Sequence, residues 1–118
     1  LAPRPYTLER YQLQEWLGFI SSELHKAFVP LFKPDTPADY KRCVRENLAA
    51  RLDYVAARLE GRNYLLGDQF TVADSYLFTV LGWGSAVEID IGRWPTLLAF
   101  QERVSQRQSV RDALKAEE

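Results

Sequence analysis

Apolar residues along the first third of the chain recur at steps of three and four, which is the spacing of an amphipathic helix. Thr7 precedes this pattern as a potential N-cap, and Glu9 supplies an acidic residue in the first turn, where the helix dipole favours one. The pattern predicts a helix over residues 7 to about 31. Its core-facing stripe consists of Leu13, Trp16, Leu17, Ile20, Leu24, Ala27, Phe28 and Leu31.

A proline-containing loop and a second helix follow. Residues 33–38 contain two prolines three positions apart, which remove backbone donors and push the preceding residues out of helical geometry. The second helix is predicted over residues 38 to about 60, with Gly61 placed to end it as a left-handed C-cap residue. We expect it to lie antiparallel to the first.

The remaining pattern predicts two more helices and a short final one. Residues 71 to about 87 are apolar nearly all round, so this helix is expected at the centre of the domain. Residues 95 to about 107 form an amphipathic fourth helix, and residues 110–115 a short last one. Because no alternating strand pattern appears, the sequence predicts an all-α fold, a bundle of about five helices.

One line on the first helix is not explained by the core. It lies roughly a third of a turn from the core stripe and contains small residues, one serine hydroxyl and the only histidine of the chain. Its members are Tyr11, Glu15, Gly18, Ser22, His25, Val29 and Phe32. Such a line is typical of a helix that lines a cleft or packs on another domain. The alternative from the residues alone is that His25 is a half-exposed helix histidine in a surface that merely docks a neighbour.

Two further features lie on the third helix. Thr71 and Asp74 have the spacing of a capping box, in which each side chain accepts from the backbone amide of the other residue. This is a folding device with no functional content of its own. Tyr76, Val80 and Trp83 share one face; they are either plain core or the wall of a cleft, and the polar tips of the tyrosine and tryptophan favour the cleft.

Composition excludes several classes of protein. The 118 residues fit one domain, and 15 basic against 16 acidic residues give a net charge of -1, with no signal for nucleic acid or a membrane. The single cysteine, Cys43, rules out an internal disulfide, suits a reducing cytoplasmic setting, and is expected to be a small, partly buried residue. One histidine and one cysteine eighteen residues apart do not make a metal site.

The capping box and its surroundings resemble a known family. The run GDQFTVAD at residues 67–74, followed by a very apolar helix, is similar to the central helix of the C-terminal domain of cytosolic glutathione transferases. Further matches, which point to the bacterial beta class, are LERY at 8–11, EWL at 15–17, SELHK at 22–26, PLF at 30–32, YLFTVL at 76–81 and DALKAE at 112–117. The resemblance covers essentially the whole chain. Gly18 is a departure, since the family can carry a glutathione-contacting asparagine there.

The resemblance implies a site. In the beta class the histidine of a matching run lines the glutathione site and assists a cysteine or serine from a thioredoxin-like N-terminal domain. Carried onto this chain, His25 is the assisting residue, and Ser22, Glu23 and Lys26 are its candidate glutathione-contacting neighbours, some of them acting across a dimer interface. Glu23 and Lys26 point away from the line of His25, so one subunit cannot bring all four to one ligand. The implied pocket for a hydrophobic electrophile consists of Phe28, Tyr76, Val80 and Trp83.

The resemblance also implies the organisation of a longer parent protein. Residues 1–6, with two prolines and no initiator methionine, are expected to be the remnant of an interdomain linker, and residues 7–118 the helical domain. The parent would be a cytoplasmic, homodimeric detoxification enzyme that conjugates or exchanges the glutathione thiol with small electrophiles. It would use glutathione as co-substrate and no other cofactor, and this chain alone would be inactive. The alternative is a non-catalytic helical interaction module of the same fold.

Overall fold

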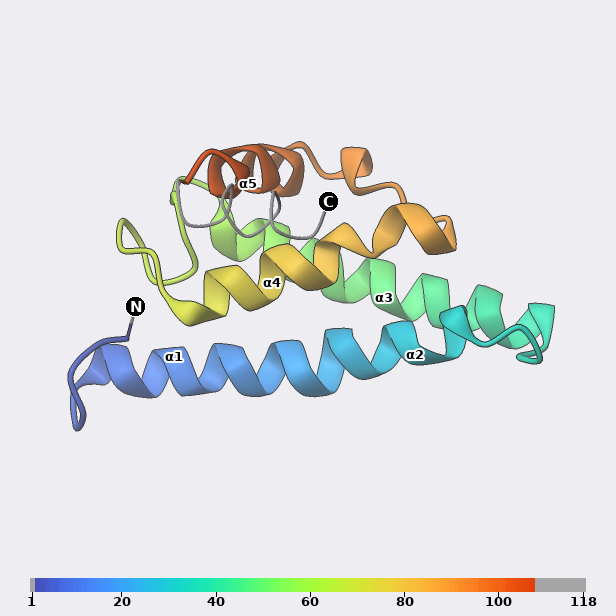
Figure 1. The fold of residues 1–118 in the computed structure, drawn as a ribbon, viewed down its shortest axis with the longest axis horizontal. Coiled ribbons are helices and arrows are strands. Elements are labelled where there is room, and N and C mark those ends of the chain that lie inside the picture. Colours follow the sequence, from blue (N-terminus) through green and yellow to red (C-terminus); the bar gives the residue numbers. More distant parts are fainter. Residues whose placement is uncertain (1, 108–118) are drawn as a thin grey trace.

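The computed structural model describes residues 2–107, which form an all-α bundle (Figure 1). The predicted fold class is therefore confirmed. Among the described residues, the nearest approach to a strand is an isolated bridge between Tyr64 and Gly67. The elements are α1 (Leu8–Phe19), a π-helical segment η1 (Ile20–His25), α2 (Lys26–Phe32), α3 (Ala38–Leu59), α4 (Val72–Gly82), the 3₁₀ turns η2 (Gly84–Val87) and η3 (Ile91–Arg93), and α5 (Pro95–Ser105).

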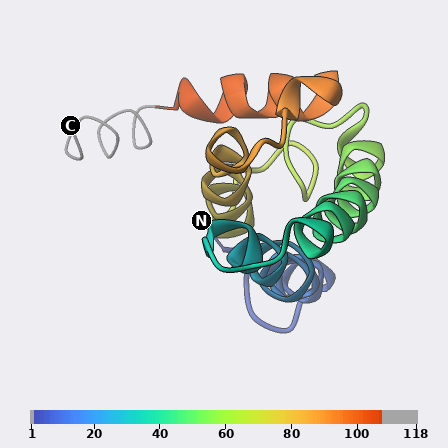
Figure 2. The ribbon, with the colours of Figure 1, turned by 90° about the vertical axis from the view of Figure 1, so that its right-hand side faces the viewer.

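Four helical walls surround a common interior. The continuous run of α1, η1 and α2 lies antiparallel to α3, as predicted, and α4 and α5 complete the ring (Figure 2). Of the α4 residues only Thr79 and Gly82 are exposed, which agrees with its apolar sequence. The core stripe predicted for the first helix also faces this interior, with Ile20, Leu24 and Phe28 fully buried.

The first helix is not a uniform α-helix, because η1 is wound as a π-helix. The amide of Lys26 donates to the carbonyl of Ser21, five residues back. Ile20 and Leu24 within this segment, and Phe28 in the turn that follows it, are fully buried.

Helix starts and stops mostly fall where the sequence places them. The Thr7 hydroxyl accepts from the Arg10 amide at 3.2 Å, and α3 is followed by Gly61 with a φ of +77°. Helix α5 begins at Pro95, directly after Trp94, whose indole donates to Asp53 on α3 at 2.5 Å. The short helix predicted at residues 110–115 lies outside the described residues.

Two predictions were wrong. The third helix was expected to reach residue 87, but α4 ends at Gly82 and the chain turns through η2. The turn needs Gly84, because a Cβ there would lie 2.7 Å from the carbonyl oxygen of Ile89. Cys43 was expected to be partly buried and is exposed, since its neighbour Val44 takes the inward position on α3.

Asp74 holds the buried N-terminus of α4. The predicted capping box is present, and the Thr71 amide donates to Asp74 Oδ2 at 2.8 Å. Asp74 also has a second role that was not predicted: its Oδ1 accepts from the Leu65 amide at 2.9 Å, which ties the preceding loop to the helix. Asp74 and Thr71 are fully buried. Burial raises the pKa of the Asp74 carboxyl above its ordinary value of 3.8, while its hydrogen bonds and the Arg107 charge oppose this effect.

Replacing Asp74 by Ala should lower the free energy of unfolding by about 2 to 4 kcal/mol, because two buried amides lose their acceptor. Urea denaturation measures the change. Asp35→Ala removes an exposed carboxylate from the loop before α3 and should cost less than about 0.5 kcal/mol. Equal losses in the two variants would contradict the role of Asp74.

The raised pKa of Asp74 predicts the sign of a pH effect. The folded state favours the protonated acid, so the contribution of Asp74 is fully present below its ordinary pKa of 3.8 and is lost as the pH rises through the higher folded value. The stability of the unsubstituted chain relative to Asp74→Asn should therefore fall as the pH rises above about 4. A stability difference that instead increases with pH would show that the hydrogen bonds lower the pKa of Asp74 more than burial raises it.

Candidate functional site

His25, at the end of η1, meets two aromatic residues, Tyr76 on α4 and Trp83 directly after the end of that helix. Its Nδ1 lies 2.6 Å from the hydroxyl oxygen of Tyr76. Its ring packs edge-to-face on Trp83, with centroids 5.0 Å apart and planes at 74°. Tyr76 and Trp83 are seven residues apart, two turns along the wall, so both can reach the one histidine. The sequence singled out all three residues but did not predict that they meet.

An aromatic cleft opens beside this histidine. Phe28 and Phe32 both pack edge-on to Trp83, with centroids 5.9 and 6.1 Å away. The cleft has a volume of about 330 Å³. Its lining residues are His25, Phe28, Val29, Phe32, Lys33 and Trp83. It is a largely apolar cleft, with one imidazole and one lysine to supply polar contacts.

Two residues predicted for the hydrophobic pocket lie behind the cleft. Val80 is fully buried in the core, and Tyr76 is half-buried with its hydroxyl against His25. Only Phe28 and Trp83 of the predicted set line the cleft itself. Tyr76 therefore reaches the site through the histidine.

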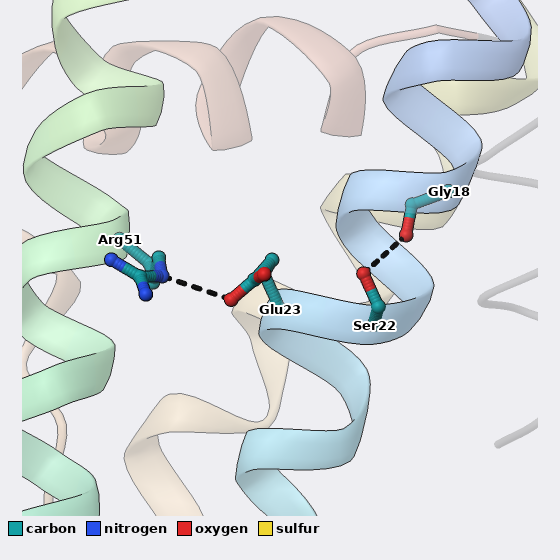
Figure 3. A network of polar contacts seen from close by, with 4 residues as sticks. All are labelled: Gly18, Ser22, Glu23 and Arg51. Atoms are coloured by element: carbon teal, nitrogen blue, oxygen red, sulfur yellow. Dashed lines mark hydrogen bonds and ion pairs between the residues drawn. The ribbon is translucent and has the colours of Figure 1, made fainter.

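Ser22, Glu23 and Lys26 lie on a different surface, which we call the polar groove, between the first helical run and α3. Figure 3 shows Glu23 directed at Arg51 on α3, and the Arg51 Nε donates to Glu23 Oε2 at 2.9 Å. The Ser22 hydroxyl donates to the carbonyl of Gly18 at 2.8 Å (Figure 3). The groove has a volume of about 430 Å³. It is lined by Ser22, Glu23, Lys26, Ala27, Pro30, Tyr40, Val44, Asn47, Leu48 and Arg51.

The predicted line along the first helix is divided between these two surfaces. His25, Val29 and Phe32 line the aromatic cleft, whereas Ser22 lines the polar groove. The prediction assumed uniform α-helical geometry, and the π-helical segment changes the direction of side chains within it. The prediction that Glu23 and Lys26 point away from His25 agrees with this arrangement.

Sequence reasoning missed Arg51 and Lys33. Arg51 is 28 residues from Glu23 in the chain, so only the antiparallel packing of α3 brings them together. Lys33 follows the predicted line directly but lies in the loop, where a helical pattern does not predict the direction of a side chain.

Between residues 2 and 107 no cluster of three or more histidine, cysteine or acidic side chains could hold a metal ion. No helix in the same range has the length and apolar character to cross a membrane.

Comparison with known proteins identifies the family to which this all-α bundle belongs. Residues 19–108 match the model of the glutathione S-transferase C-terminal domain, and the chain belongs to this family. The resemblance to the bacterial beta class is confirmed as well. Glutathione S-transferase GstA of Escherichia coli O157:H7 is 46% identical over 94% of this chain and 55% of its own length.

Solved structures agree with the family assignment. The chain superposes on BphK, a bacterial glutathione S-transferase solved as a ternary complex, with a TM-score of 0.96 and 56% identity over 99% of this chain and 58% of that one. A beta-class enzyme of Sphingomonas chungbukensis gives a TM-score of 0.92 and 45% identity, over 99% and 58% of the two chains. The chain thus spans a little more than half the length of these relatives.

The ion pair between Glu23 and Arg51 should contribute little to stability. Its side chains are 45% and 49% exposed, so water screens the attraction. A double-mutant cycle of Glu23→Gln and Arg51→Gln should give a coupling energy of about 0.2 to 1 kcal/mol. The pair Asp39 and Arg42, at 3.6 Å and more exposed, is the control and should give less. Coupling well above 1 kcal/mol would mean that the pair organises the groove.

Proposed function

We propose that this chain is the helical half of a glutathione S-transferase that conjugates or exchanges the glutathione thiol with small hydrophobic electrophiles. In this proposal residues 1–6 are a linker, residues 7–118 are the C-terminal domain, and a thioredoxin-like domain precedes them in the parent protein. The parent acts in the cytoplasm as a homodimer and serves detoxification. Membership of the family and the length of the relatives support this layout.

The observation that carries the proposal is the placing of His25 at the edge of the aromatic cleft. An imidazole can exchange a proton with a thiol, or donate a hydrogen bond to a thiolate, at neutral pH. The N-terminal domain supplies a cysteine or a serine beside the glutathione thiol, and His25 assists that residue. The cleft holds the electrophile beside the imidazole, with Phe28 and Trp83 as walls, Tyr76 behind the histidine and Val80 supporting the wall from the core.

The polar groove supports a divided glutathione site. Ser22, Glu23 and Lys26 offer a hydroxyl, a carboxylate and an ammonium group, which suit the charged ends of a peptide such as glutathione. They line a different surface from His25, so they would contact the glutathione of a second subunit. A sphingomonad relative, 44% identical to this chain, has been solved with glutathione bound. Because the site is divided, this chain alone should be inactive.

His25→Ala in the full-length protein should lower kcat/KM for conjugation of a chloronitrobenzene by about 10- to 100-fold, since an assisting group beside the thiol is lost. Turnover is followed by the absorbance of the conjugate. Gln14→Ala, an exposed substitution on α1, is the control and should leave turnover unchanged. Wild-type turnover in His25→Ala would remove His25 from the site, whereas absence of turnover in the unsubstituted full-length protein would favour the non-catalytic module.

A further inference from the structure

The short hydrogen bond between His25 and Tyr76 joins residues 51 positions apart and lies in a half-buried place. A separation of 2.6 Å between Nδ1 and the hydroxyl oxygen is at the strong end of the range for such bonds. The sequence assigned Tyr76 only to a pocket wall. The bond gives it a second task, because it fixes one of the two ring nitrogens of the histidine.

The direction of this bond depends on which nitrogen of the imidazole carries the proton. A neutral imidazole carries one proton, so one nitrogen donates and the other accepts. A phenolic O–H is a stronger hydrogen-bond donor than an imidazole N–H, and an imidazole nitrogen is a better acceptor than a phenol oxygen, so the favoured arrangement has the Tyr76 hydroxyl donating to His25 Nδ1. In that arrangement the ring proton is on Nε2. No described residue between 2 and 107 is hydrogen-bonded to Nε2, so that N–H is available to a ligand.

The ring is also held against rotation. Trp83 packs on its edge with a centroid distance of 5.0 Å, and Tyr76 lies at 5.8 Å with its plane at 78°. Turning the ring over would replace Nδ1 by a carbon and leave the half-buried Tyr76 hydroxyl without its partner. Packing and hydrogen bonding therefore select the same orientation.

We propose that Tyr76 is a positioning residue that keeps His25 in the Nε2–H tautomer, so that His25 offers a hydrogen-bond donor to the ligand. This inference rests on the proposed function and narrows it. The atom that accepts this hydrogen bond is one that glutathione carries, either a thiolate sulfur or a carboxylate oxygen. In this tautomer the neutral imidazole has no free nitrogen to take up the thiol proton. It stabilises an anion that is already formed, and the apolar walls of the aromatic cleft strengthen that bond.

The tautomer can be measured without any assay of activity. In full-length protein labelled with ¹⁵N-histidine, the His25 signals are those missing from the His25→Asn spectrum. At about pH 8.5, where an ordinary imidazole is neutral, we expect the proton on Nε2. Tyr76→Phe keeps the ring and removes the hydroxyl, so the signals should move toward those of a free imidazole. Tyr64→Phe, at another half-buried tyrosine with a bonded hydroxyl, should leave them unchanged.

Turnover gives the second readout. Tyr76→Phe should lower kcat/KM by about three- to tenfold, the effect of one hydrogen bond. Glutamine can place an amide N–H near the position of Nε2 and asparagine cannot, and neither amide acts as a base. A donor role therefore predicts about tenfold higher kcat/KM for His25→Gln than for His25→Asn.

The outcomes separate this inference from the proposed function. A proton on Nδ1 in the wild type, an unchanged tautomer in Tyr76→Phe, or equal activity of His25→Gln and His25→Asn would each overturn the positioning role. In those cases a strong loss in His25→Ala would leave the transferase function standing. Conversely, a tautomer that shifts in Tyr76→Phe while His25→Ala retains full turnover would confirm the structural bond and refute any use of it in the reaction.

Discussion

The buried carboxylate of Asp74 is the interaction on which the rest of the structure depends. An interior helix needs acceptors for its first amides, and no water reaches them. Asp74 supplies one acceptor to the Thr71 amide and another to the Leu65 amide, so the helix start and the loop before it are fixed together. The position of α4 in turn places Tyr76 and Trp83 against His25. A folding device thus sets the geometry of the candidate site from the start of the same helix.

The π-helical segment is the second constraint, and it links packing to function. It contains Ile20 and Leu24, which are fully buried in the interior. The same segment carries Ser22 and Glu23 toward α3 while His25 ends beside α4. One helical run therefore serves two surfaces of different chemistry, an aromatic cleft and a polar groove. This division accords with a site completed by a neighbouring domain and a second subunit.

Helical periodicity was enough to predict most of the fold. The core stripe, the proline loop, the ends of α3 and the Thr71 cap follow from local rules, and the structure confirms them. The end of α4 could not be predicted, since it depends on the close approach of Gly84 to Ile89. Cys43 was misplaced because a small residue next to an inward-facing valine fits either side of a helix. In both cases a contact distant in sequence decided the outcome.

The candidate site was predictable in its residues but not in its connections. His25, Tyr76 and Trp83 were each identified from spacing or resemblance, yet nothing local indicates that a hydroxyl 51 positions away would hold the imidazole. The ion pair of Glu23 with Arg51 was missed for the same reason.

These connections bear on the role that we propose for the histidine. A histidine on a helix surface can be a base, an acid or a bystander, and only its partner on Nδ1 selects among these roles. Here that partner belongs to the helix which the core requires for stability. The tyrosine that bonds the histidine is therefore positioned by the same helix that completes the core.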